Sequence, residues 1–98
     1  MGRLDNKVAI ISGAAKGQGA FEAALFASEG AKVVLADIDI GACEANARDI
    51  VKNKGIASAI HLDVTSSESW TNCIKFTVEK YQSLDVLCLL YTSDAADE

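Results

Sequence analysis

The features that the sequence lacks narrow the class of protein to which it can belong. Half of its 98 residues are apolar and none is proline, a composition too apolar for a disordered chain. Even so, no apolar run approaches the ~20 residues that a membrane-spanning helix requires, and residues 1–7 lack the apolar core of a signal peptide. Lysine and arginine form no cluster, which argues against nucleic-acid binding. The three cysteines are too scattered for a metal pair or a disulfide framework, so we expect a reducing, cytoplasmic setting.

Short β-rich runs alternate with helical stretches along the chain. Apolar runs typical of buried strands occupy residues 7–12 and 32–37. Residues 56–61, where Ala and Ser dilute the apolar run, are expected to form a third strand, and a strand-like apolar run occupies 84–90. The spacing of apolar residues predicts helices over 17–29 and 40–51, and a third that ends at residue 81. Helical crossovers of this length join parallel strands through right-handed connections. The order therefore predicts an α/β fold in residues 1–87: a Rossmann-type, doubly wound parallel sheet that is incomplete, with one β-α-β-α-β-α-β half.

The predicted helices carry their own start and stop signals. Gly30 follows the first helix as a natural C′ residue. The sequence Thr65-Ser66-Ser67-Glu68 predicts a capping box, in which Thr65 caps the third helix and Glu68 reaches back. The first helix is apolar at Phe21, Ala24, Leu25 and Ala27. The third is expected to carry on one face Trp70, Ile74, Thr77, Val78 and Tyr81.

A glycine-rich segment joins the first strand to the first helix, with the sequence Ser12-Gly13-Ala14-Ala15-Lys16-Gly17-Gln18-Gly19. Glycines at such a place permit a tight turn, let the backbone approach a pyrophosphate and bring helix and strand close together. The unpaired amides of the helix N-terminus also favour an anion. The segment therefore predicts a nucleotide site, the alternative being a tight turn without a ligand.

The GxxxGxG spacing, preceded by Ser12, resembles the TGxxxGxG turn of the short-chain dehydrogenase/reductase family. The lead-in Gly2-Arg3-Leu4-Asp5-Asn6-Lys7-Val8-Ala9 is similar to that family's GRLxxKVA, and the resemblance extends to Leu87. Glucose, cyclic-alcohol and hydroxysteroid dehydrogenases look nearest. The resemblance implies the N-terminal part of an NAD(P)-dependent oxidoreductase that acts on an alcohol or ketone, as a homodimer or homotetramer. It places the dinucleotide against Gly13, Ala15, Lys16, Gly17, Gln18, Gly19, Asp37, Ile38, Asp63 and Val64.

Two of these residues bear on which dinucleotide is bound. Asp37 ends the second strand, where an acid accepts hydrogen bonds from the ribose hydroxyls and repels a 2′-phosphate. The alternative for Asp37 is a solvated strand-end residue or a helix cap, and the capping role could instead fall to Asp39. Lys16 is the family's phosphate-tolerant cue, but a carboxylate in direct contact should outweigh a mobile lysine, so NAD is favoured over NADP. By the same resemblance Asp63 bonds the adenine amino group and Val64 flanks the ring, the alternative for Asp63 being a turn residue.

The resemblance stops after Leu84-Asp85-Val86-Leu87. The family continues with Asn-Asn-Ala-Gly and carries its catalytic serine, tyrosine and lysine further on, whereas this chain continues Cys88-Leu89-Leu90-Tyr91-Thr92. No catalytic residue is assigned, because neither Tyr81 nor Tyr91 has a lysine four residues later. Residues 88–98 resemble a translated sequencing adaptor, in which TGT CTC TTA TAC ACA TCT spells Cys-Leu-Leu-Tyr-Thr-Ser.

We therefore expect residues 88–98 to be a non-native tail, the alternative being a genuine divergent end. Taken alone, the chain is expected to be a catalytically inactive nucleotide-binding half-domain. The remaining alternative is a structural fragment without a ligand.

Overall fold

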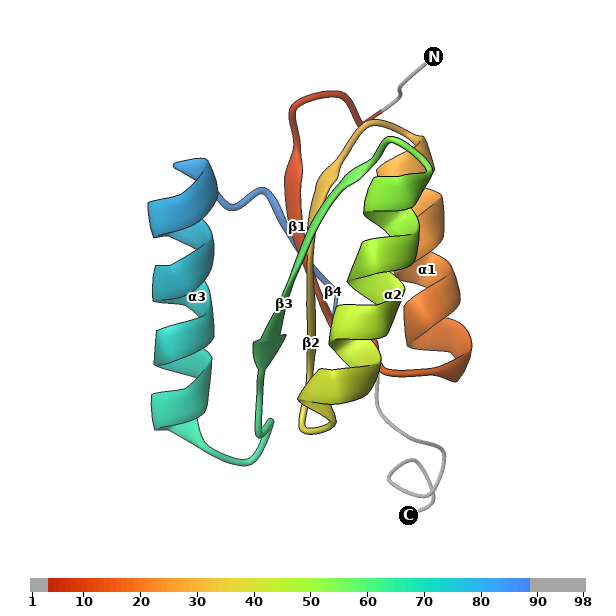
Figure 1. The fold of residues 1–98 in the computed structure, drawn as a ribbon. Coiled ribbons are helices and arrows are strands. Elements are labelled where there is room, and N and C mark those ends of the chain that lie inside the picture. The colour runs from red at the N-terminus through yellow and green to blue at the C-terminus, as the bar shows by residue number, and fades with distance from the viewer. Residues whose placement is uncertain (1–3, 89–98) are drawn as a thin grey trace.

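The computed structural model describes residues 4–88 (Figure 1). In this range four strands alternate with three helices: β1 (Val8–Ser12), α1 (Gly17–Ser28), β2 (Lys32–Asp37), α2 (Ile40–Lys52), β3 (Ile56–His61), α3 (Ser67–Tyr81) and β4 (Val86–Cys88). The predicted alternation is confirmed. None of these helices is long and apolar enough to span a membrane. Leu89 and Leu90, predicted to continue the last strand, lie outside the described residues.

All four strands are parallel and lie in the order β3-β2-β1-β4. After β3 the chain crosses the sheet and adds β4 on the other side of β1, so the strand order reverses between β1 and β4. Helices α1 and α2 cover one face and α3 the other (Figure 1). This confirms the incomplete Rossmann-type sheet. In such sheets ligands bind at the carboxyl ends of the strands, beside the point of reversal.

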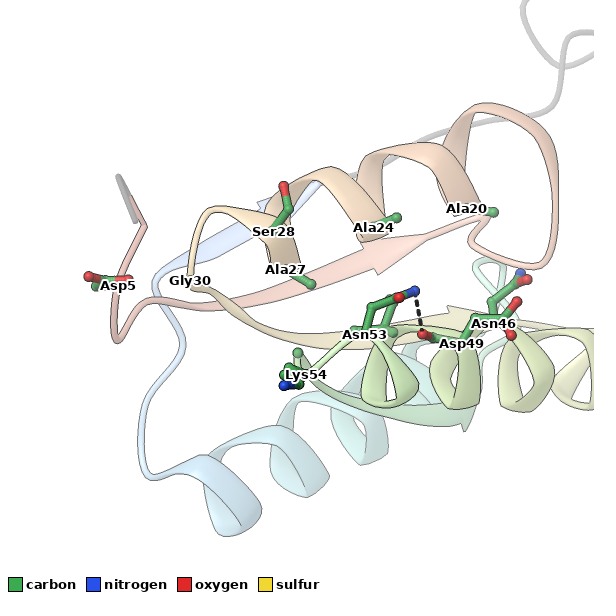
Figure 2. A pocket seen from close by; sticks show the side chains of 12 residues that line it. Asp5, Ala20, Ala24, Ala27, Ser28, Gly30, Asn46, Asp49, Asn53 and Lys54 are labelled. Atoms are coloured by element: carbon green, nitrogen blue, oxygen red, sulfur yellow. Dashed lines mark hydrogen bonds between the residues drawn. The ribbon is translucent and has the colours of Figure 1, made fainter. Parts of the chain in front are cut away.

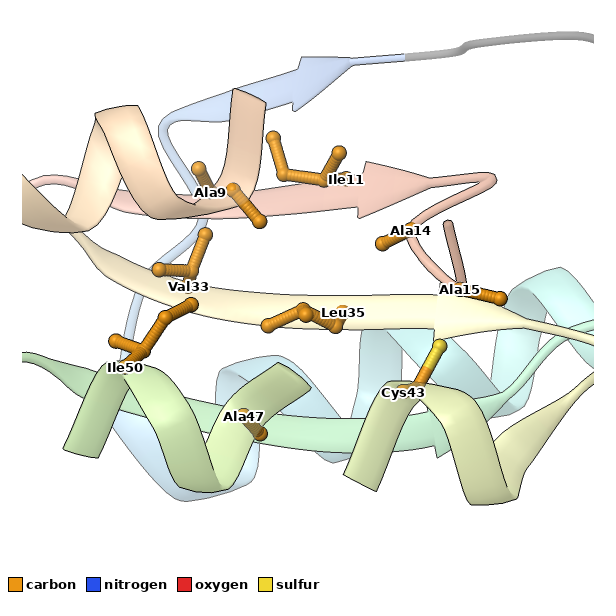
Figure 3. Packing of buried hydrophobic residues seen from close by; sticks show 10 residues of the cluster. Ala9, Ile11, Ala14, Ala15, Val33, Leu35, Cys43, Ala47 and Ile50 are labelled. Atoms are coloured by element: carbon orange, nitrogen blue, oxygen red, sulfur yellow. The ribbon is translucent and has the colours of Figure 1, made fainter. Parts of the chain in front are cut away.

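The core lies on both faces of the two central strands. Successive side chains of a strand point to opposite faces, and all five residues of β1 are buried, which explains why the first four of them are all apolar. One cluster packs β1 and β2 against the first two helices, through Ala9, Ile11, Ala14, Ala15, Ala23, Val33, Leu35, Cys43, Ala47 and Ile50 (Figure 3). The opposite cluster packs the sheet against α3, through Ile10, Val34, Ala36, Leu62 and Cys73.

The apolar residues from which α1 is predicted are mostly not the residues that it buries. Its buried residues are Gly19 and Ala23, and of the predicted set Ala27 packs against the core. Phe21 is 67% exposed and Leu25 is 46% exposed. Small side chains let the helix lie close to the strands, so the contact stripe is made of the residues that contribute least to a hydrophobic pattern.

The predicted face of α3 is confirmed for Thr77 and wrong for Ile74 and Val78. Cys73 and Thr77 are buried, whereas Ile74 is 37% exposed and Val78 is 42% exposed. Trp70 and Tyr81, also predicted, do pack against the core. The helix therefore turns the stripe through Cys73 and Thr77 toward the sheet, and the stripe through Ile74 and Val78 outward.

The predicted capping box of α3 is also wrong. Ser66 caps the helix, its Oγ accepting the backbone N–H of Ser69 at 3.1 Å. Thr65 instead donates to the carboxylate of Asp63 in the preceding turn, with Oγ1 2.6 Å from Oδ1. The helix thus starts one residue later than predicted, and Glu68 falls one position short of the third helical residue that a capping box requires.

Candidate functional site

The glycine-rich segment after β1, residues 13–19, is called the glycine turn, and it leaves β1 at the carboxyl edge of the sheet. Gly13 has a φ of +67° and Gly17 a φ of +64°, a left-handed backbone that other residues adopt only with strain. Gly19 serves a different need. A Cβ at this position would overlap the carbonyl oxygen of Gly13 and lie 2.6 Å from its carbonyl carbon. Glycine is therefore required twice for the turn and once for the close approach of α1 to it.

Helix α1 begins at this turn without a side-chain cap. Lys16 is the N-cap residue, with extended backbone and no cap hydrogen bond, and the first turn of α1 contains no acidic residue. By contrast, Asp39 caps α2 and Ser66 caps α3. The first amides of a helix have no partner within it, and they carry the positive end of its dipole. The start of α1, which includes exposed Gln18, therefore presents N–H groups suited to an anion.

Asp37 stands at the end of β2, against the same turn. Its Oδ2 accepts the backbone N–H of Ala15 at 3.4 Å, and its Oδ1 accepts the N–H of Asp39 at 2.9 Å. Asp39, not Asp37, caps α2, by accepting the N–H of Ala42 at 3.1 Å. The next side chain, Ile38, is 65% exposed. A partly exposed carboxylate and an apolar side chain thus lie together at the rim of the turn.

Asp63 and Val64 follow β3 at the same edge. The Asp63 carboxylate accepts the O–H of Thr65 at 2.6 Å and its N–H at 3.0 Å. These two bonds hold the pKa of the Asp63 carboxyl below its ordinary value. Val64 is 43% exposed, and its carbonyl accepts the indole N–H of Trp70 at 3.1 Å. The Asp63 carboxylate therefore stabilises this turn, and the same turn exposes an apolar side chain.

Backbone hydrogen bonds join these three segments. The N–H of Ala14 donates to the carbonyl of Ala36 at 3.2 Å, which ties the glycine turn to the end of β2. The N–H of Leu62 donates to the carbonyl of Asp37 at 3.0 Å, which ties the loop after β3 to the same strand end. The residues predicted for the site therefore lie along one continuous edge of the sheet.

Sequence reasoning missed Asn46, which contacts the glycine turn from α2. Its side-chain amide donates to the carbonyls of Ala14 at 3.1 Å and Ala15 at 2.8 Å. The available signal was its place in the helix: Asn46 follows the buried Cys43 by three positions and precedes the buried Ala47. A polar residue beside an apolar stripe can bond to the backbone of whatever packs there.

The short chain dehydrogenase family matches residues 7–89 of this sequence. The chain belongs to the short-chain dehydrogenase family. It is 46% identical over 91 residues to trans-4-hydroxycyclohexanecarboxylate dehydrogenase of Sinomonas cyclohexanicum, a match that covers 87% of this chain and 35% of that protein. It is 44% identical over 85 residues to 2,5-dichloro-2,5-cyclohexadiene-1,4-diol dehydrogenase of Sphingobium indicum, covering 87% and 34%.

A solved relative shares the fold. The structure of a 7α-hydroxysteroid dehydrogenase complexed with NADH and 7-oxo glycochenodeoxycholic acid matches with a TM-score of 0.85 and 38% identity, covering 87% of this chain and 33% of that one. The chain thus spans about a third of the length of these short-chain dehydrogenases.

Other chemistry-bearing residues of this short-chain dehydrogenase segment have structural roles. The hydroxyl of Tyr81 shares a 2.7 Å hydrogen bond with that of Ser58. Within residues 4–88, no group of three His, Cys, Asp or Glu side chains is placed to hold a metal ion.

The predicted non-native tail begins at Cys88, which ends β4 and is paired with Ile11 of β1. The rest of the predicted non-native tail, with Tyr91, lies outside the described residues.

Proposed function

We propose that this chain binds the ADP-ribose half of a nicotinamide dinucleotide, as the N-terminal part of an oxidoreductase acting on an alcohol or ketone. The observation that carries the proposal is the contact of the Asp37 carboxylate with Ala15, in the turn that leads into the uncapped start of α1. The pyrophosphate would lie on the amides at Gly17, Gln18 and Gly19, because these N–H groups have no partner within the helix. Gly19 also fits such a turn, because a Cβ there would overlap the Gly13 carbonyl that packs against the start of α1.

The carboxylate of Asp37 supports NAD over NADP. It can accept hydrogen bonds from both ribose hydroxyls, whereas a 2′-phosphate would bring two like charges together. Lys16 is exposed at the N-cap of α1 and would face the phosphates from a mobile side chain. The adenine ring would lie at the rim formed by Ile38 and Val64, which are 65% and 43% exposed, with Asp63 beside its amino group.

For the complete protein we propose hydride transfer at a secondary alcohol or ketone. A bound nicotinamide supplies the hydride chemistry, and the protein supplies position and electrostatics. Three relatives are named for a hydroxycyclohexane carboxylate, a cyclohexadiene diol and a hydroxysteroid, which favours a ring-borne hydroxyl as the substrate class. We further propose a homodimer or homotetramer in the cytoplasm, the compartment suited to its three free cysteines.

The described residues offer no tyrosine with a lysine four positions later, since Asp85 stands at that position after Tyr81. We therefore propose that the 98-residue chain binds the dinucleotide without turning over substrate. A dehydrogenase assay on the chain should give no signal, and measurable turnover would contradict this assignment.

Fluorescence titration of NADH with the purified chain tests the binding proposal. We expect a saturable enhancement that ADP-ribose reverses, because ADP-ribose carries every group assigned to this edge and lacks the nicotinamide. The control variant is Asp49→Asn, which removes a charge from an exposed position of α2 and should bind NADH as tightly as the unmodified chain. No saturable signal at high chain concentration would leave the alternative of a structural fragment without a ligand.

We also propose that residues 88–98 are not native. Sequencing the source locus from independent DNA should continue past the codon for Leu87 into Asn-Asn-Ala-Gly and, later, Tyr-x-x-x-Lys. If Cys88–Glu98 and a stop codon are recovered instead, the oxidoreductase proposal fails for this chain and nucleotide binding alone stands.

A further inference from the structure

Asn46 of α2 makes a pair of hydrogen bonds whose geometry suggests a role beyond packing. Its Nδ2 donates to the carbonyl oxygens of two consecutive residues of the glycine turn, Ala14 at 3.1 Å and Ala15 at 2.8 Å. Asn46 lies at one end of a groove between α1 and α2, opposite Ala20 at the start of α1 (Figure 2). A single side chain thus bridges the body of α2 to the segment that leads into α1.

The same two residues of the turn are held from the other side by β2. The N–H of Ala14 donates to the carbonyl of Ala36 at 3.2 Å, and the N–H of Ala15 donates to Asp37 Oδ2 at 3.4 Å. Two donors are therefore satisfied by β2, and two acceptors by Asn46. All four backbone polar groups of Ala14 and Ala15 are engaged, which fixes the orientation of both residues.

This fixed segment lies between two flexible points. Gly13 on one side and Gly17 on the other both have positive φ angles, +67° and +64°, and glycine has more conformations to lose than any other residue. A turn that is loose before binding must be ordered by the ligand, which weakens affinity. Bonds that hold Ala14 and Ala15 in place before binding remove part of that cost.

We propose that Asn46 is a positioning residue for the dinucleotide. It does not touch the cofactor; it holds the carbonyls of Ala14 and Ala15 against α2 so that the amides following Lys16 stay aligned for the pyrophosphate. An uncharged amide is required, because a carboxylate would face two carbonyl oxygens without a proton to donate. The inference rests on the proposed function.

The test compares Asn46→Asp with wild type by NADH titration of the 98-residue chain. Asn46→Asp preserves the size of the side chain and removes both donors, and Asn46→Ala is the second variant in case the added charge unfolds the chain. We expect either variant to bind NADH about tenfold more weakly, which corresponds to about 1.4 kcal/mol. The matched control is Asn53→Asp, at the C-cap of the same helix and in the same groove, whose amide donates to the Asp49 carbonyl at 3.0 Å and not to the turn.

A second measurement separates positioning from general stability. In the free Asn46 variant, ¹⁵N relaxation should show increased mobility at Lys16, Gly17 and Gln18, and saturation with NADH should restore wild-type values. The inference is overturned if relaxation at these amides is unchanged and the loss of unfolding free energy accounts for the whole loss of NADH affinity. Asn46 would then have a merely structural role.

The two proposals fail in different ways. If wild type binds NADH and both Asn46 variants bind it equally well, the positioning role is wrong and the proposed function stands. If wild type does not bind NADH, the proposed function fails and the positioning role fails with it.

Discussion

The carboxylate of Asp37 accepts the backbone N–H of Ala15 at 3.4 Å, across 22 positions of the sequence. This contact joins the end of β2 to the middle of the glycine turn. It links the group proposed to select the ribose to the segment proposed to hold the pyrophosphate. A substitution at Asp37 should therefore affect both dinucleotide affinity and the order of the turn.

Asp37→Asn should change the preference between NADH and NADPH. The variant keeps the size of the side chain and one acceptor oxygen but removes the charge that opposes a 2′-phosphate. Hydrogen bonds to a charged group contribute roughly 1.5–3 kcal/mol against about 1 kcal/mol for neutral ones. We expect NADH affinity to fall by about tenfold and NADPH affinity to rise, as measured by parallel fluorescence titrations.

The control for this change is Asp49→Asn, which removes an equal charge from the exposed side of α2. Its ratio of NADH to NADPH affinity should equal that of wild type. An unchanged ratio in Asp37→Asn would rule out the ribose role of Asp37.

Gly17→Ala and Gly19→Ala should differ in their effect on stability. Gly17 has a φ of +64° but open space where a Cβ would lie, so the substitution should cost only the strain of a left-handed residue, about 1–2 kcal/mol. At Gly19 a Cβ would overlap the Gly13 carbonyl, and both the turn and α1 would have to move. Urea unfolding should show the larger loss for Gly19→Ala. Equal losses would indicate that α1 does not pack so closely on the turn.

The sequence was sufficient to predict the elements because their signals are local. The buried strands are continuous apolar runs, and Gly30 ends α1 with a φ of +98°, as its C′ position predicts. The capping of α2 by Asp39, considered as an alternative for Asp37, is confirmed by the 3.1 Å bond to Ala42. Each of these features depends on residues a few positions apart.

Features that depend on distant contacts were not predictable in the same way. The bonds of Asn46 to the turn span 31 and 32 positions, and nothing in the neighbouring sequence specifies them. Helix α1 is predicted from apolar residues that include Phe21 and Leu25, whereas Gly19 and Ala23 make the contact. Which stripe faces the sheet is decided by how closely the helix can approach, and small residues permit the closest approach.

Ser66→Ala should destabilise the chain more than Thr65→Ala. Ser66 Oγ caps α3 by accepting the N–H of Ser69 at 3.1 Å, and loss of an N-cap oxygen costs roughly 0.5–2 kcal/mol. Urea unfolding of the two variants measures the difference. The opposite order would restore Thr65 as the cap of α3.

Thr65→Ala should instead raise the pKa of Asp63, because the Thr65 hydroxyl is the main cause of its lowered value. A carboxyl with a lowered folded pKa stabilises the fold above its unfolded pKa, and that contribution is lost as pH falls through the folded value. The variant should therefore lose less stability than wild type on acidification below the ordinary value of 3.8. NMR titration of the Asp63 carboxyl measures the shift directly, and an unchanged pKa would contradict the assigned hydrogen bond.

Cys43 should make the chain less stable at alkaline pH. Burial, with smaller contributions from the carboxylates of Asp37 and Asp39, raises the pKa of the Cys43 thiol from 9.0 to about 12. The folded state thus keeps a proton that the unfolded state releases, so this contribution is complete below pH 9.0 and is lost as pH rises toward 12. In that window each such thiol lowers the unfolding free energy by up to about 1.4 kcal/mol per pH unit. Urea unfolding near pH 8 and near pH 10 should show a smaller decrease for Cys43→Ala than for wild type, and equal decreases would assign the alkaline loss to other groups.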